Sequence, residues 1–325
     1  INLLNTNNVT NMSSMFASTG KNAMTSLDLG NNFDTSSVID MQSMFLETGY
    51  TEMTSLDLGN NFDTSNVNNM SQMFTTTGYT EMTSLELGDK FDTSNVTDMT
   101  GMFRETGYRA MTSINLGDKF DTSNVTEMDY MFFCTGYIAM TSLDLGDKFD
   151  TSNVTDMTAM FSATGYRAMT SLKLGDKFDT SNVTNMRNMF EFTGHTAMTS
   201  LNLGDKFDTS NVFSMSRMFW QTGYTEMTIL DLGPAFTKIP NGTENFISGC
   251  GKKGAVIYAP EAIYQNSTNL KLGTDSNTIK YLDMIIEIDE EGYVANETIL
   301  DTPRGKIIPK YRTEWLKEGT TIDTS

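Results

Sequence analysis

The phrase that decides the fold is Phe91-Asp92-Thr93-Ser94-Asn95-Val96-Thr97-Asp98-Met99-Thr100-Gly101-Met102-Phe103. It recurs with few changes every 29 residues, in eight consecutive copies with no insertion or deletion. A fixed internal period of this length is typical of solenoids, in which each copy forms one coil and stacks on the next.

Each copy also predicts a strand ahead of this phrase. Leu85 and Leu87 share one face of an alternating segment and Ser84 and Glu86 share the other, so only the leucines point inward. Gly88 then permits a bend. None of the apolar faces can be covered within one coil, so coils must stack with their strands parallel.

The second half of the copy has helical spacing. Val96, Met99, Met102 and Phe103 lie at i, i+3, i+6 and i+7, which predicts one or two turns of α- or 3₁₀-helix opposite the strands. Asn95 is placed to cap this helix rather than to carry a glycan. We therefore predict an α/β repeat solenoid with one parallel β-sheet, short helices on the opposite side and a C-terminal cap.

The strand segment, Met82-x-x-Leu85-x-Leu87, has the core pattern of leucine-rich repeats with Met in the first position. Together with the Phe91–Phe103 phrase, it resembles the BspA-type leucine-rich repeats of bacterial surface proteins and lipoproteins, over residues 1 to about 236. The resemblance implies a right-handed coil and an extracellular or cell-surface protein, attached to the cell, that binds proteins or carbohydrate, often in adhesion. Repeats of that family are usually a few residues shorter.

Three segments follow from the repeat and its end. We assign residues 1–236 to a solenoid of eight 29-residue repeats, 237–283 to a capping region, and 284–325 to a short β-rich appendage or the start of a further domain. The chain enters in mid-coil with no signal peptide, so we expect a longer protein. No run approaches 18 apolar residues, which predicts no membrane span.

Composition narrows the partners and the chemistry. The chain has 22 Lys and Arg against 41 Asp and Glu, a net charge of −19, which argues against nucleic acid or an anionic bilayer as partner. Three Met in each copy account for 24 of the 25 Met, and we expect all 24 to be buried in three columns.

Nothing in the copies predicts catalysis. The only His, His195, stands where other copies have Tyr, and Cys134 stands at a variable outer position. A nucleophile needs an adjacent base, and the copies offer none. We therefore expect no enzyme, no catalytic residue and no metal-ligating residue.

Aspartates recur in two columns, one containing Asp92 and the other containing Asp89 beside Lys90. Like charges at the spacing of one coil repel unless they are offset, either by Asx turns with backbone N–H groups or by bridging calcium. The phrase lacks the closely spaced carboxylates of calcium loops. We therefore predict Asx turns and no cofactor, with calcium as the alternative.

Two surfaces are candidate binding sites. The first is the outer face of the sheet, with a small, polar, mildly acidic column: Asp28, Asp57, Glu86, Asn115, Asp144, Lys173, Asn202 and Asp231. The second is an edge rich in aromatic and Arg residues, the types favoured at binding hot spots: Tyr50, Tyr79, Tyr108, Arg109, Tyr137, Tyr166, Arg167, Trp220 and Tyr224. The alternative for this edge is that its rings only shield the joints between coils.

Two functions compete. The first is a non-catalytic interaction module for an extracellular protein or carbohydrate. The alternative is a structural spacer that presents another domain away from the cell, which near-identical copies favour. An ice or carbohydrate binder built on the Thr column that includes Thr83 is less favoured, because its neighbours are Met and Ser rather than a second Thr column.

Overall fold

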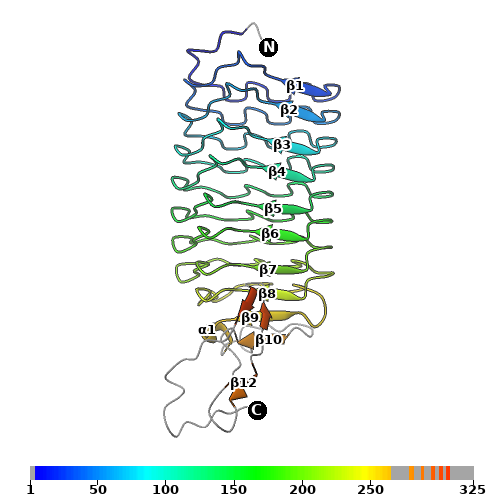
Figure 1. The fold of residues 1–325 in the computed structure, drawn as a ribbon, viewed down its shortest axis with the longest axis vertical. Coiled ribbons are helices and arrows are strands. Elements are labelled where there is room, and N and C mark those ends of the chain that lie inside the picture. Colours follow the sequence, from blue (N-terminus) through cyan, green and yellow to red (C-terminus); the bar gives the residue numbers. More distant parts are fainter. Residues whose placement is uncertain are drawn as a thin grey trace.

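The computed structural model describes residues 4–264 and, beyond them, the five short strands β10 to β14. The repeats form an elongated parallel β-solenoid whose coils lie one below another, with the strands along one side (Figure 1). Each coil contributes one strand of three residues: β1 (Ser26–Asp28), β2 (Ser55–Asp57), β3 (Ser84–Glu86), β4 (Ser113–Asn115), β5 (Ser142–Asp144), β6 (Ser171–Lys173), β7 (Ser200–Asn202) and β8 (Ile229–Asp231).

The strands pair in the register of the repeat. Leu27 lies opposite Leu56, and Leu201 opposite Leu230, so equivalent side chains stack in columns. The predicted single sheet is nevertheless divided, because the repeat strands β1 to β8 lie in three two-stranded sheets, β1-β2, β3-β4 and β5-β6, and in one four-stranded sheet that includes β7 and β8. Backbone hydrogen bonds just before the strands, such as Thr141 N–H to Thr112 O, continue across these breaks.

The predicted helices opposite the strands are wrong. In the described residues the only helix is α1 (Glu261–Tyr264), and the Met-Phe segment is a chain of tight turns. Alternate amides from Met99 to Glu105 donate to carbonyls of the next coil, as Phe103 N–H does to Met131 O at 2.9 Å. The amides between them close turns within the coil, as Met102 N–H does to Met99 O. Successive turns and a helix present the same apolar spacing, so the spacing could not separate them.

The core consists of stacked Met, Leu, Val and Phe columns that run through all the coils. Phe74 and Phe103 stack with centroids 5.7 Å apart, and Phe62 and Phe91 form part of a second column. The predicted burial of the Met columns is confirmed with two exceptions in the first copy, Met15, which is 39% exposed, and Met24, which is half-buried.

Beyond the repeats, β9 (Val256–Ala259) pairs with β8 and continues the parallel ladder to β10 (Thr278–Tyr281). Two antiparallel pairs follow: β11 (Glu287–Ile288) with β12 (Val294–Asn296), and β13 (Leu300–Thr302) with β14 (Gly305–Ile307). The predicted boundary at residue 283 lies outside the described residues and stays a prediction. Among the described residues, no helix has the length and apolar character needed to cross a bilayer.

Candidate functional site

The Asp-Thr-Ser-Asn phrase holds a turn within its own coil and joins that coil to both neighbouring coils. Asp92 Oδ1 accepts from the Ser94 N–H at 3.0 Å, which is the predicted Asx turn. The buried Thr93 hydroxyl donates to Asp121 O in the next coil, and Asn95 Nδ2 donates to Ser65 O in the preceding one. The predicted role of Asn95 as a helix cap is therefore wrong, since no helix follows and its side chain joins two coils instead.

The predicted Asx turns are present along the whole first Asp column: Asp34, Asp63, Asp92, Asp121, Asp150, Asp179 and Asp208. At Asp34, hydrogen bonds from the Ser36 N–H and then the Ser36 hydroxyl hold the pKa of the carboxyl below its usual value. The described residues contain no group of three or more His, Cys, Asp or Glu placed to hold a metal ion. These carboxylates serve the turns of each coil.

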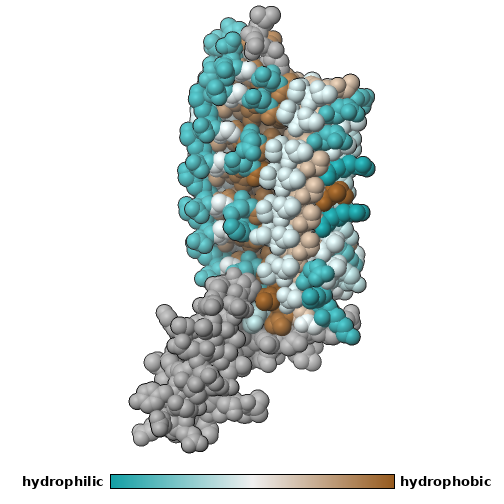
Figure 2. Space-filling model, turned by 45° about the vertical axis from the view of Figure 1, so that its right-hand side comes forward, coloured by the Kyte–Doolittle hydropathy of each residue, from teal (hydrophilic) through white to brown (hydrophobic). Residues whose placement is uncertain are grey.

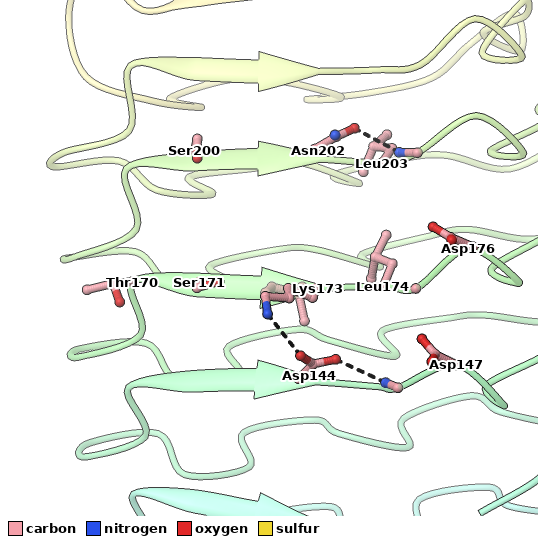
Figure 3. Close-up of a pocket in the computed structure, with 14 residues that line it drawn as sticks. Asp144, Asp147, Thr170, Ser171, Lys173, Leu174, Asp176, Ser200, Asn202 and Leu203 are labelled. Atoms are coloured by element: carbon pink, nitrogen blue, oxygen red, sulfur yellow. Dashed lines mark hydrogen bonds and ion pairs between the residues drawn. The ribbon is translucent and has the colours of Figure 1, made fainter. Parts of the chain in front are cut away.

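The sheet face has a structural role that the sequence did not reveal. Asp144 Oδ1 accepts from the Gly146 N–H at 3.1 Å and so fixes the bend that follows its strand. Its other oxygen forms an ion pair with Lys173 at 3.1 Å (Figure 3). The bend is held in the same way at Asp28, Asp57, Asn115, Asn202 and Asp231.

The predicted sheet-face column is exposed from Asp28 to Lys173, but it does not continue unchanged to its end. Asn202 is half-buried, and Asp231 is only 1% exposed, so it is not part of an accessible surface. An open groove that includes part of the column is lined by residues of three coils, among them Asp144, Asp147, Lys173, Asp176 and Asn202. In the space-filling view of Figure 2, the surface of the solenoid consists of vertical stripes of hydrophilic and near-neutral residues, and strongly hydrophobic surface lies mostly in the narrow gaps between them.

The predicted tyrosines form one continuous stack. Adjacent rings from Tyr50 to Tyr166 lie 4.6 Å apart with interplanar angles of 4° to 9°. His195 continues the stack at 4.5 Å from Tyr166, and Tyr224 follows at 5.2 Å. Burial, and then the neighbouring Tyr137 and Tyr79, raise the pKa of Tyr108 to about 12.

His195 takes a structural place in this column. Its Nε2 lies 3.3 Å from Gln221 Oε1, and burial lowers the pKa of the imidazole below its usual value. Arg109 and Arg167 are exposed beside the stack.

Cys134 is also partly buried, and this burial raises the pKa of its thiol to about 12. At neutral pH the side chain is therefore a thiol and not a thiolate.

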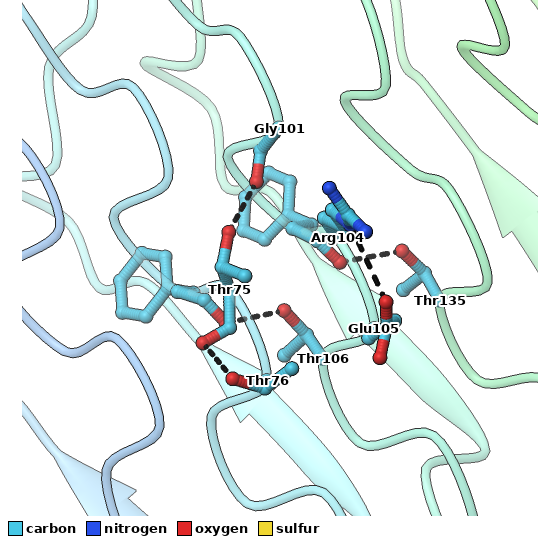
Figure 4. Close-up of polar contacts among 9 residues, drawn as sticks. Thr75, Thr76, Gly101, Arg104, Glu105, Thr106 and Thr135 are labelled. Carbon is cyan, nitrogen blue, oxygen red and sulfur yellow. Dashed lines mark hydrogen bonds and ion pairs between the residues drawn. The ribbon is translucent and has the colours of Figure 1, made fainter. Parts of the chain in front are cut away.

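Four columns next to the tyrosines differ from the rest of the repeat, and we call them the variable face. They are the columns of Thr100, Gly101, Arg104 and Glu105. Where Arg104 stands, the eight copies carry eight different residues: Ala17, Leu46, Thr75, Arg104, Phe133, Ser162, Glu191 and Trp220. Polar contacts of this face join neighbouring coils, as the Thr75 hydroxyl does in donating to Gly101 O (Figure 4).

Two of these columns have left-handed backbone. All eight residues in the Gly101 column and all eight in the Glu105 column have φ between 52° and 60°. Gly and Asn adopt this conformation most readily, yet only Gly101 and Asn188 among the sixteen are of these types. The residue types here therefore do not follow the preference of the backbone.

Large side chains of the variable face gather in two clusters. In one, the Arg104 guanidinium lies 5.9 Å from the ring centre of Tyr130 and 5.3 Å from that of Phe133. In the other, Arg217 lies 4.8 Å from the Trp220 ring, which packs against Phe192 at 5.0 Å. Trp220 belongs to the edge predicted from the sequence, whereas Arg104, Tyr130 and Arg217 would have been found only by comparing each column across the copies.

A row of carboxylates borders the same face. Burial, followed by Asp129, Asp156 and Asp98, raises the pKa of Glu127 above its usual value. Burial also raises the pKa of Asp129, although Asp129 Oδ1 accepts from the Thr100 hydroxyl at 3.0 Å. These groups repel one another more than the Asx-turn column does.

Together these features define a parallel β-solenoid protein whose polar columns join its coils and whose sequence varies on one face. The chain belongs to the family described as Mycoplasma protein of unknown function, DUF285, which matches residues 1–103, 77–169 and 138–229. No curated protein and no solved structure matches it significantly.

Proposed function

We propose that the protein is a non-catalytic interaction module that binds an extracellular protein or glycan through the variable face. The observation that carries this proposal is that residue types vary between copies in the columns of the variable face, whereas most other columns of the repeat are nearly unchanged. Stacking alone needs no such variety, because one residue set would serve all eight coils equally well.

Backbone strain supports the same proposal. A non-Gly residue in the left-handed region costs roughly 1 kcal/mol, and the two left-handed columns contain fifteen such residues. Strained backbone conformations are most common at functional sites. Selection for contact with a partner would explain why these strained positions carry side chains other than Gly.

The composition of the two clusters also fits binding. Trp, Tyr and Arg dominate binding hot spots, and Arg104, Tyr130, Arg217 and Trp220 are exposed or half-buried. The sheet face offers Ser, Asp and Asn, of which several hold the bends after the strands. We therefore place the partner on the variable face rather than on the sheet face.

The resemblance to BspA-type leucine-rich repeats supports an extracellular or cell-surface location on a bacterial cell. The leucine-rich-repeat-like, right-handed character of the coil belongs to the same proposal. The net charge of −19 supports a partner other than nucleic acid, and the proposal includes no cofactor.

A structural spacer is the second candidate, and the continuous core favours it. The Met and Phe columns run through the coils, and buried Thr hydroxyls such as that of Thr106 tie each coil to an earlier one. Such a body would hold another domain at a fixed distance even if no side chain of its own bound a partner.

A binding screen separates the two candidates. The chain would be applied to arrays of extracellular proteins and of glycans, together with Arg217→Ala/Trp220→Ala and the sheet-face control Ser84→Ala/Glu86→Ala. We expect a partner whose binding falls at least tenfold in the first variant and is unchanged in the control. Binding lost only in the control would contradict our choice of face, and no binding at all would favour the spacer.

A further inference from the structure

The tyrosine stack places reactive rings at a regular spacing. Tyr50, Tyr79, Tyr108, Tyr137 and Tyr166 come from five successive coils, and each adjacent pair has centroids 4.6 Å apart. The rings are also nearly parallel, with interplanar angles of 4° to 9°, so each phenol lies beside the phenol of the next coil. No other described tyrosine has a tyrosine as its stacked neighbour.

Access to these rings is from the side. All five tyrosines are half-buried, while the inner rings have both faces covered by their neighbours in the stack. A sugar or an aromatic side chain would need a free ring face, which the inner rings lack. Electron transfer to a small oxidant needs only the exposed edges.

We propose that the Tyr50–Tyr166 stack is a modification site, at which one-electron oxidants join tyrosines of adjacent coils as dityrosine. Each of two neighbouring phenols gives one electron to one equivalent of oxidant and its hydroxyl proton to water. The two radicals couple through a new bond between ring carbons ortho to the oxygens. Each coupled carbon then gives up its hydrogen as a proton, and the ketone oxygen of the same ring takes up a proton, which restores both phenols. In all, the pair has lost two electrons and two protons.

The stack favours coupling within the chain over coupling between chains. A radical on one ring has another phenol in contact, whereas a second molecule must reach it by diffusion. The Tyr108 phenol is also protonated at neutral pH, because its pKa is about 12. Each new bond would join residues 29 apart in sequence and would tie one coil covalently to the next.

The chain supplies its own boundary to the reaction. His195 separates Tyr166 from Tyr224, so those two tyrosines are not in contact. Tyr130 contacts the ring of Phe133 at 5.8 Å instead of a second tyrosine. Coupling should therefore stop at Tyr166 and leave Tyr130 and Tyr224 uncoupled.

The test uses the whole chain, photo-oxidised with tris(bipyridine)ruthenium(II) and limiting persulfate, followed by peptide mapping. We expect monomeric product with dityrosine fluorescence and a loss of two hydrogens per cross-link. The cross-links should join Tyr50 to Tyr79, Tyr79 to Tyr108, Tyr108 to Tyr137 and Tyr137 to Tyr166. The melting temperature should rise with the number of cross-links. Dityrosine mainly in covalent dimers, or mainly at Tyr130, Tyr224 or Tyr258, would overturn the proposal, as would no dityrosine.

Two conservative variants test the role of the stack itself. Tyr108→Phe keeps an aromatic ring in the column but removes a phenol. The cross-links of position 108 to Tyr79 and Tyr137 should therefore disappear, while those between Tyr50 and Tyr79 and between Tyr137 and Tyr166 remain. His195→Tyr should extend coupling to Tyr224. Coupling of Tyr79 to Tyr137 in Tyr108→Phe, or no coupling to Tyr224 in His195→Tyr, would show that ring contact does not direct the reaction, and either result would overturn the proposal.

Discussion

The two sides of each coil reach the same burial by different backbone. On the strand side, Leu85 lies between exposed Ser84 and Glu86 in an extended segment. On the turn side, Met102 and Phe103 are fully buried, yet the backbone around them alternates between tight turns and bonds to the next coil. Side-chain pattern therefore identifies what is buried on both sides, but identifies the backbone only on the strand side.

The largest effect should come from oxidising the Met columns, two of which lie in the turn-side phrase. Limited peroxide should oxidise Met15 first, since it is 39% exposed, and leave the melting curve unchanged. Oxidation of the buried Met residues converts apolar thioethers into polar sulfoxides and should abolish cooperative unfolding. Mass spectrometry with circular dichroism would follow both stages. Full oxidation with an unchanged melting curve would show that the columns are not buried in solution.

Buried and exposed hydroxyls sharpen the comparison of the two sides. Thr106 is fully buried on the turn side, and its hydroxyl donates to Phe74 O at 2.7 Å. Thr106→Val removes one of the two hydrogen bonds that Phe74 O accepts, since the Thr77 N–H still donates to it, and should cost about 0.5–1.5 kcal/mol. Thr112→Val, on the strand side, removes an exposed 3.2 Å bond to Thr83 O and should cost less than about 0.5 kcal/mol. Equal losses in urea unfolding would contradict this difference.

The sequence alone predicted the coil, its period and nearly all of its core, because burial depends on side-chain type and all copies agree. It predicted the Asx turns for the same reason. It failed on the turn-side backbone because Val96, Met99, Met102 and Phe103 fit a helix equally well. What distinguishes the structure is where the amides of Gly101 and Phe103 donate, and that partner lies 28 residues away in another coil.

The candidate site was predictable only in part. The tyrosine column follows from the repeat, and Trp220 from its residue type. The contacts of Arg104 with Tyr130 and Phe133 could not be predicted in the same way, because they join side chains of adjacent coils on the turn side. Asp231 lies in β8, which pairs with β9 beyond the last repeat, so the repeat period could not predict its burial.

A substitution at Gly101 distinguishes turns from a helix by the sign of its effect. Gly101 has φ of 60°, and a Cβ there would have no neighbour closer than 3.6 Å, so Gly101→Ala adds backbone strain without a clash. We expect a loss of about 1 kcal/mol in the free energy of unfolding. A helix interior would instead gain about 1 kcal/mol. Thr76→Gly, in the other left-handed column, should stabilise by a smaller amount, and a gain at Gly101→Ala would refute the turns.

The smallest effect should come from the carboxylates beside the turns. Because the folded-state pKa of Glu127 is raised, its ionised form destabilises the fold, and the penalty grows as pH rises from the unfolded pKa to the folded pKa. Glu127→Gln should therefore stabilise at pH 7, by less than about 0.5 kcal/mol because the side chain is exposed and solvent screens the repulsion, and should have little effect below about pH 4. Asp34, with its lowered pKa, should behave oppositely, since its ionised form stabilises the fold and that contribution is lost as pH falls through the folded pKa. Urea unfolding from pH 3 to 7 would compare Glu127→Gln with Asp34→Asn. Similar pH dependence in both variants would show that the Asx-turn column and the carboxylate row do not differ electrostatically.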